Sequence, residues 1–289
     1  MAAVERGGRG EGAAALSALF CLASPRIAAL DPAFASLALS TMASLYRQSG
    51  RHGVGRRLDG QALALLPAVA HGLVGDSVDD AWVRIAHLDA RTGLAADNLG
   101  IGSFAASERL LDGVRDLLVP AVAQASSPAQ DPELNWLGVI RPRLRWHWVS
   151  AELAMYTGRP AAAVEHATAG VRLLDSVEGH DRHRIKTDLI AAAAYASAGD
   201  VARAAALAAS CESRARTAGL VPLTWAALAL RSGVDDASAQ EAAPLTDVPP
   251  ADTSLAHSPL LQTVASLAQA HDMLVSRGMP FAPRSPRGV

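Results

Sequence analysis

Apolar residues recur at helical spacing along most of the chain, and no sustained alternation of apolar and polar residues is found. Leu144, Trp148, Ala151 and Met155 form one apolar row in the segment Leu144–Thr157, which is apolar on more than one side. A helix that is apolar nearly all round is buried against neighbours on two sides. Because strand signals are also missing, the pattern predicts an all-α protein.

Glycine, proline and aspartate residues mark the ends of the expected helices between residues 143 and 233. Glycine commonly ends a helix, proline fits its first turn, and aspartate caps its amino end. The expected boundaries are Gly158 after the first helix, Pro160 to Val177 for the second, Asp181 to Gly199 for the third, and Asp200 to Thr217 for the fourth. Pro222 opens the fifth helix, Leu223 to Ser232, which Gly233 ends. The loops left between these expected helices are short, and short loops make consecutive helices antiparallel. Weaker helical patterns cover Asp79–Thr92 and Phe104–Leu118.

The turn glycines also mark an internal repeat. Gly158 and Gly199 are 41 residues apart, and Gly199 and Gly233 are 34 apart, which is the range of helical-repeat periods. Alanine and aromatic residues recur around glycines in four segments. These segments are Ala191–Tyr195 with Gly199, Asp200, Ala204 and Ala208; Ala151–Gly170 with Gly158, Ala163 and Ala167; Ala43, Tyr46, Gly50, Ala62 and Pro67; and Trp225–Gly233.

This pattern resembles the tetratricopeptide repeat (TPR), and it is similar to the helical-repeat halves of actinobacterial transcriptional regulators. The resemblance implies an α-solenoid of antiparallel helical hairpins with a right-handed superhelical twist. The chain departs from the pattern at two kinds of position. His147 and Asp188 stand where the motif has tryptophan, and Ala167 and Ala208 replace the large aromatic residue of the second helix.

In TPR proteins the first helices of successive hairpins line a concave groove that binds peptides. The resemblance carries this groove onto six positions, which are Arg47, Arg145, Trp148, Glu152, Tyr156 and Lys186. Arg145 and Lys186 are suited to hold a carboxylate or phosphate, while Trp148 and Tyr156 are suited to anchor a partner. The alternative is that both aromatic residues belong to the core.

Composition divides the chain into five parts. Residues 1–12 are rich in glycine and charge and indicate a disordered tail, and residues 13–242 form the helical-repeat domain. Residues 243–259 are rich in proline and indicate a linker. Residues 260–278 return to helical periodicity, and we expect this helix to cap the end of the array. Residues 279–289 form a second tail.

The net charge is −2 with a pI near 6.5, which gives no overall attraction for nucleic acid or an anionic membrane. No apolar run reaches the length of about 18 residues that a membrane span needs. We therefore expect a cytoplasmic protein. Ala13–Ala23 is short and apolar like the centre of a secretion signal, but the preceding residues are not net positive.

Two basic segments raise the alternative of nucleic-acid binding. Residues 141–148 interleave arginine with tryptophan, which is suited to stacking bases. On a helix, however, Arg141 and Arg145 share one face, so the pattern favours solvated arginines beside core tryptophans. The second segment, with Arg47, Arg51, His52, Arg56 and Arg57, spans an expected turn and favours a solvated loop.

Catalytic chemistry has little support in the sequence. No zinc-protease, phosphate-loop, dinucleotide-binding or nucleophile-elbow motif is present. The adjacent pair His180–Asp181 resembles one half of a metal site, but its expected position is a turn, and no further ligands complete it. Cys21 and Cys211 fit no metal or redox spacing, and we expect both to be buried thiols.

The sequence therefore predicts a non-catalytic scaffold, without cofactor or metal, that binds a protein or peptide in the groove of a TPR-like array. The alternative is a sensory module that acts together with a DNA-binding partner. Formation of a homo-oligomer is left open.

Overall fold

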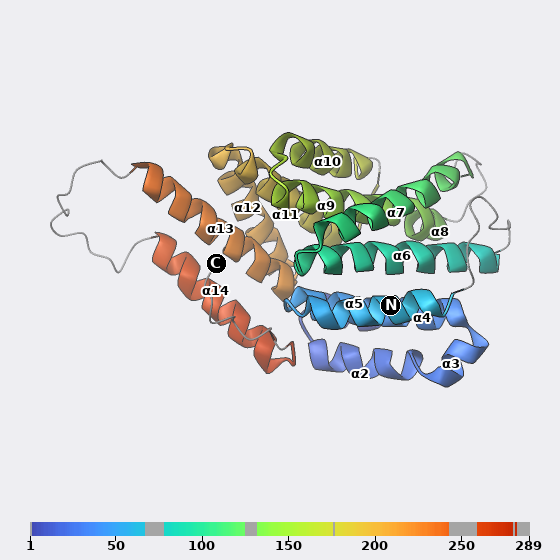
Figure 1. The fold of residues 1–289 in the computed structure, drawn as a ribbon. Helices are drawn as coiled ribbons and strands as arrows, with labels where there is room; N and C mark the ends of the chain where they lie inside the picture. The colour runs from blue at the N-terminus through green and yellow to red at the C-terminus, as the bar shows by residue number, and fades with distance from the viewer. Residues whose placement is uncertain are drawn as a thin grey trace.

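A computed structural model describes residues 2–66, 78–124, 132–175, 177–242, 259–279 and 281. The all-α prediction is confirmed, since these residues contain helices and no strand. The helices are α1 (Ala2–Gly8), α2 (Gly12–Leu22), α3 (Pro25–Leu30), α4 (Pro32–Gln48), α5 (His52–Ala64), α6 (Val78–Gly100), α7 (Phe104–Gln124), α8 (Pro132–Asn135), the π-helix η1 (Trp136–Ile140), α9 (Arg141–Tyr156), α10 (Pro160–Leu173), α11 (Asp181–Ser197), α12 (Val201–Thr217), α13 (Val221–Ala242) and α14 (Pro259–Ser276) (Figure 1). Among the helices formed by these residues, none is both long and apolar enough to cross a membrane.

Local sequence accounts for most of the helix ends. Pro160 occupies the first turn of α10, and the Asp200 carboxylate accepts a hydrogen bond of 3.2 Å from the Arg203 backbone N–H at the start of α12. Gly158 and Gly199 adopt left-handed backbone angles, with φ of +67° and +84°. Other residues adopt this conformation only at a cost, so these two glycines stop α9 and α11.

Consecutive helices pack against each other from α4 onward, in the pairs α4–α5, α5–α6, α6–α7, α7–α9, α9–α10, α10–α11, α11–α12, α12–α13 and α13–α14. Alternate helices also touch, since α4 contacts α6, α6 contacts α9, α9 contacts α11, and α11 contacts α13. We call α4, α6, α9, α11 and α13 the first-helix layer. Every charged or aromatic residue that the sequence assigned to a groove lies on this layer.

Alanine lines several of the contacts between helices. One buried cluster joins α9, α10 and α11 and consists of Ala151, Ala154, Ala163, Ala167, Ile190, Ala191 and Ala194. Small side chains let helix axes approach closely while losing no side-chain entropy on folding. The apolar interior is accordingly divided into separate clusters between neighbouring helices.

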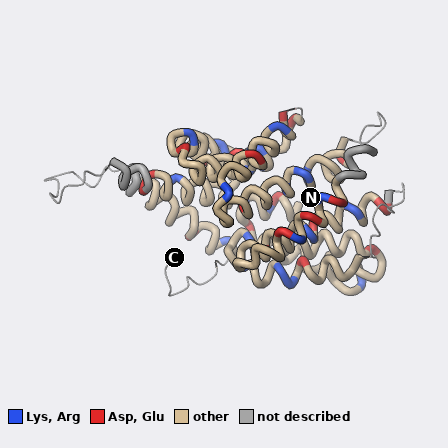
Figure 2. The backbone as a smooth tube through the Cα atoms, turned by 45° about the horizontal axis from the view of Figure 1, so that its top comes forward, with Lys and Arg blue, Asp and Glu red and all other residues tan. Residues whose placement is uncertain are grey.

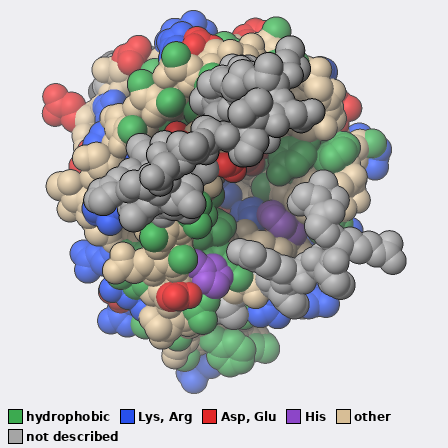
Figure 3. Space-filling model, turned by 90° about the vertical axis from the view of Figure 1, so that its left-hand side faces the viewer, with side chains coloured by type: hydrophobic (Ala, Val, Ile, Leu, Met, Phe, Trp, Pro, Cys, Tyr) green, Lys and Arg blue, Asp and Glu red, His purple; other side chains and the backbone are tan. Residues whose placement is uncertain are grey.

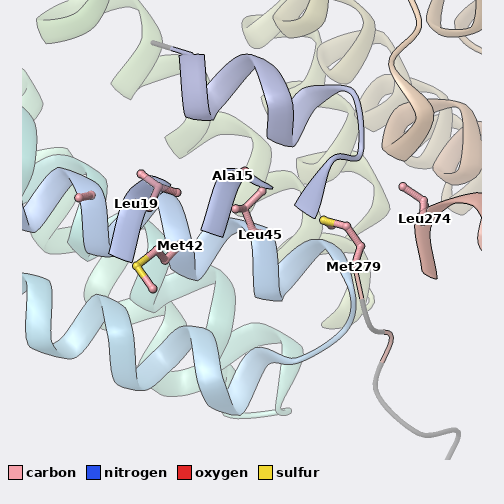
Figure 4. Packing of buried hydrophobic residues seen from close by; sticks show 7 residues of the cluster. Ala15, Leu19, Met42, Leu45, Leu274 and Met279 are labelled. Atoms are coloured by element: carbon pink, nitrogen blue, oxygen red, sulfur yellow. The ribbon is translucent and has the colours of Figure 1, made fainter. Parts of the chain in front are cut away.

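The two ends of the chain meet in one apolar cluster (Figure 4). Ala15 and Leu19 come from α2, Ala38, Met42 and Leu45 from α4, and Leu274 and Met279 from the α14 end. The backbone N–H of Ala13 donates a hydrogen bond of 3.1 Å to the Arg277 carbonyl, and the Arg277 side chain donates one of 3.0 Å to the Arg9 carbonyl. Because α14 also packs on α13, the helical array closes on itself.

The expected disordered tail over residues 1–12 is wrong for Ala2–Gly8, which form α1. Gly7 and Gly8 are buried because α1 comes close to other helices there. A Cβ atom at Gly7 would lie 2.6 Å from Leu45 Cδ2 on α4. The glycines of this segment therefore permit close packing, which composition alone reads as disorder.

At the other end of the chain, the expected helix over residues 260–278 is present as α14, and it packs on α13 and α2. Most of the expected linker (residues 243–258) and the last residues (282–289) lie outside the described part of the chain. Met279 and Phe281 were expected to belong to a tail, but both pack against the cluster where the chain ends meet.

Three smaller expectations differ from the structure. Gly233 does not end a helix, since α13 continues to Ala242. Asp181 was expected to precede α11 and cap it. Instead, Asp181 is the first residue of α11, His180 precedes it with a φ of 55°, and no side chain caps the helix. Cys211 is buried as expected, whereas Cys21 is exposed.

Candidate ligand-binding site

Arg47, at the end of α4, is held by carboxylates from two other helices. Its Nε and Nη2 atoms donate to the two carboxylate oxygens of Asp97 on α6, at 2.8 and 2.9 Å. Its Nη2 atom also donates to Asp59 Oδ2 on α5 at 2.5 Å and to the Gly93 carbonyl at 3.2 Å. Burial alone would lower the pKa of Arg47, but Asp59 and Asp97 raise it overall. Arg47 is therefore a fixed cation that joins three helices.

Gly93 makes this arrangement sterically feasible. A Cβ atom at Gly93 would lie 2.1 Å from Asp59 Oδ2, a distance at which the carboxylate would have to move. Asp59 thus reaches Arg47 only because α6 carries glycine at the point where α5 crosses it. His52, at the start of α5, completes the group, with its Nδ1 atom 3.3 Å from Asp97 Oδ1.

Burial changes the protonation of the Asp59 carboxyl group. Burial raises the pKa of Asp59 to about 7, since the opposing attraction of Arg47 only partly offsets the loss of water. The negative charge of Asp97 acts in the same direction as burial. The folded state therefore favours the protonated form of Asp59 more than the unfolded chain does.

A second buried ion-pair group lies eight residues earlier on α6. Asp89 accepts a hydrogen bond of 2.6 Å from Arg141 Nη2, and its other oxygen accepts from Arg145 Nη1. Burial alone would raise the pKa of Asp89, but the two guanidiniums hold it below the usual value. Arg141 and Arg145 do share one helix face, as the sequence predicts. They are not solvated, however, since each side chain is at most 20% exposed.

These two groups form one electrostatic system along the first-helix layer and α5. Arg145 interacts electrostatically with Arg47 and Asp59 in addition to Asp89. Figure 2 shows basic and acidic positions interspersed along the helices, with no continuous stripe of one sign in that view. Figure 3 shows a hollow in one end of the molecule, with basic and histidine side chains gathered inside it.

The other expected groove residues lie on α9 and α11. The Lys186 Nζ atom is 3.4 Å from Glu152 Oε1, and both side chains are about one-third exposed. Trp148 donates a hydrogen bond of 3.0 Å from Nε1 to Thr187 Oγ1 and is half-buried among apolar residues. Tyr156 is 69% exposed, which makes it the accessible aromatic residue of the set. A binding role for these residues stays a prediction.

A histidine and tryptophan group lies beside the arginines. The His180 ring stacks on Trp136 of η1 at a centroid distance of 3.6 Å, and His183 contacts the edge of Trp136 at 4.9 Å and the face of Trp148 at 6.0 Å. Burial and the nearby charge of Arg182 lower the pKa of His183 to about 3. His183 is therefore neutral at physiological pH.

Part of the basic turn segment borders an open cavity of about 350 Å³. The cavity is lined by Gly50, Arg51, His52, Gly53, Val54, Arg57, Gly100 and Ile101. Arg56 and Arg57 are exposed as expected of a solvated segment, whereas Arg47 points into the ion-pair group described above.

Within the described ranges, no group of three histidine, cysteine or carboxylate residues is arranged to hold a metal ion. The pair His180–Asp181, which was expected in a turn, lies at the start of α11. There, His180 stacks on a tryptophan and Asp181 is exposed.

Sequence reasoning did not identify the carboxylates that hold Arg47 and Arg145. A signal was present, because Asp89 and Asp97 lie eight residues apart in a helical pattern with Gly93 between them. Two such residues fall near the same helix face. Their partners lie on other helices, so only the fold identifies them.

Comparison with known proteins finds no matching family model, no curated protein with significant similarity and no solved structure with significant similarity. The TPR-like relationship accordingly stays a prediction.

Proposed function

We propose that this protein is a non-catalytic scaffold of the TPR-like type, which binds a protein or peptide segment along its first-helix layer. The observation that carries the proposal is the direct contact of α4, α6, α9, α11 and α13 in series. In helical-repeat proteins such a layer forms the continuous wall on which an extended ligand lies. The layer belongs to antiparallel hairpins in a superhelix, and the cytoplasm is its proposed location.

The accessible part of this wall is the segment of α9 and α11 around Glu152, Tyr156 and Lys186. Tyr156 offers an exposed ring, and the partly exposed pair Glu152–Lys186 offers one charge of each sign. Aromatic residues and charged side chains at such positions provide anchoring and specificity. Arg47 contributes indirectly, since its guanidinium is engaged by two carboxylates of the protein itself, and Arg145 is paired with Asp89.

The experiment is affinity purification with the full chain as bait, followed by mass spectrometry of the retained proteins. We expect a stoichiometric partner that Tyr156→Ala and Lys186→Glu each weaken. Arg109→Ala is the matched control, because Arg109 is exposed on α7 outside the first-helix layer. Equal retention by wild type and both groove variants would remove the groove assignment.

The alternative is a sensory module that acts with a DNA-binding partner, and the closed array favours it in one respect. The chain ends meet, and Arg145 is held with other charged side chains in a largely buried system. A small ligand that enters this interior would stabilise the array. A thermal-shift panel of small molecules tests this alternative, and absence of any stabilising ligand would count against it.

A further inference from the structure

Arg182 lies in the first turn of α11 and has no partner of opposite charge among the described residues. No carboxylate of the described residues forms an ion pair with it, and it has no hydrogen bond there. The side chain is partly buried, and Gly8 at the end of α1 lies against it. A Cβ atom at Gly8 would lie 3.3 Å from Arg182 Nε. Arg182 is thus a partly buried cation without a counter-charge among the described residues.

Two further guanidiniums lie near Arg182. The pKa of Arg182 is lowered by burial and by the positive charges of Arg141 and Arg145, so the three side chains occupy one region. Ring contacts support this placement, because His180 and His183, on either side of Arg182 in sequence, reach Trp136. Trp136 lies in η1, directly before the first turn of α9 that carries Arg141.

The position of Arg182 is unfavourable for a cation in three separate ways. It is partly buried, it is near like charges, and it lies at the amino end of a helix, where the helix dipole favours anions. Asp89 already accepts hydrogen bonds from both Arg141 and Arg145. Departures from local rules of this kind are expected at functional sites.

We propose that Arg182, Arg141 and Arg145 form a binding site for a phosphate group. Three guanidiniums against the one carboxylate of Asp89 leave two positive charges, which match a phosphate dianion better than a single carboxylate. Guanidiniums are also suited to bidentate contact with phosphate oxygens. The uncapped amino end of α11 adds backbone N–H groups of the same polarity.

Both a free small molecule and a phosphorylated peptide carry a phosphate group, and the probes separate the two sources. Thermal stability and calorimetric binding are measured for the full chain with inorganic phosphate, with acetate at equal ionic strength, and with a phosphoserine peptide beside its unphosphorylated form. We expect saturable stabilisation of the wild type by a phosphate-bearing probe, and none by acetate. Stabilisation by inorganic phosphate identifies a free anion, and stabilisation by the phosphopeptide alone identifies a peptide-borne one.

Arg182→Met is the deciding variant, because it keeps the length of the side chain and removes the charge. It should weaken phosphate binding at least about tenfold, the loss expected for one charge-assisted hydrogen bond. Arg182→Lys keeps the charge, gives up the bidentate geometry and should weaken binding less. Arg182→Lys also tests the phosphate site if the Arg182→Met variant does not fold. Tyr156→Ala should bind inorganic phosphate as the wild type does, which keeps this test separate from that of the proposed function.

The unliganded stability provides a second readout. Removing an unneutralised cation should leave the Arg182→Met variant at least as stable as the wild type, whereas a purely structural arginine would lower stability when replaced. The proposal is overturned if no phosphate-bearing probe stabilises the wild type, or if both Arg182 variants bind phosphate with unchanged affinity.

Discussion

At the scale of single residues, the ion pairs of Arg47 depend on glycine as much as on charge. Asp59 and Asp97 approach Arg47 from different helices, and the Asp59 carboxylate occupies the space where a Cβ atom of residue 93 would lie. The sequence identified Arg47 as a functional candidate from the TPR pattern alone. It did not identify the carboxylates, because the pairing spans 50 residues between Arg47 and Asp97.

Gly93→Ala should destabilise the protein by about 1–3 kcal/mol, the usual cost of forcing extra volume into a packed interior. Denaturant unfolding of the purified chain measures the change. Gly60→Ala is the matched control, since Gly60 lies in α5 with nothing within 4 Å of the added atom. There, alanine should stabilise the helix by about 0.5–1 kcal/mol. Equal effects of the two substitutions would contradict the steric account of Gly93.

Asp59 gives a prediction for the pH dependence of stability. Its pKa is raised from 3.8 to about 7, so the folded state retains a proton that the unfolded state releases. The contribution of this group is therefore fully present below about pH 4 and is lost as the pH rises towards 7. Asp59→Asn should remove this fall, as measured by unfolding free energies between pH 4 and 8. A wild-type curve parallel to that of the variant would refute the assignment.

At the scale of helices, the periodic pattern located α9, α10, α11 and α12 because each has a packed face and a clear end signal. It was wrong at Gly233, where α13 continues. A helical glycine costs about 1 kcal/mol relative to alanine, and packing of α13 on α12 and α14 outweighs this. The sequence pattern was also wrong at α1, where glycine residues allow close packing against other helices. A glycine-rich segment that packs closely and one that is disordered have the same residue pattern.

His183 lies where η1, α9 and α11 meet, and its pKa predicts that the free energy of unfolding falls in acid. The pKa of His183 is lowered from 6.5 to about 3, so its stabilising contribution is complete above pH 6.5 and is lost as the pH falls below that value. His183→Phe keeps an aromatic ring beside Trp136 and Trp148 but cannot take up a proton. Its unfolding free energy should fall less between pH 6.5 and 4 than that of the wild type. Identical slopes would exclude His183 as the titrating group.

The last helix should contribute strongly to stability through one residue. Leu274 is 1% exposed in the cluster where the chain ends meet, so Leu274→Ala should cost about 2–5 kcal/mol. Its neighbour Val275 is 46% exposed, and Val275→Ala should change stability by no more than about 0.5 kcal/mol. Chemical denaturation compares the two. A small effect of Leu274→Ala would mean that α14 packs only loosely.

At the scale of the whole molecule, closure links the ends of the chain to its charged interior. The sequence predicted that the last helix would cover the end of the array, but not that α2 would meet it. The contact depends on Leu19, Leu45 and Leu274, which lie far apart in the sequence and share no motif. Closure also places the end of α1 against Arg182, which connects the packing of the chain ends to the proposed phosphate site.

Hydrogen–deuterium exchange of the full chain, compared between the wild type and Leu274→Ala, tests this closure most directly. The account predicts that loosening α14 also speeds amide exchange in α2, in α4 and in the first turn of α11 around Arg182, while the α10 amides change little. Faster exchange confined to α14 would contradict it, because the two chain ends would then not hold each other in place.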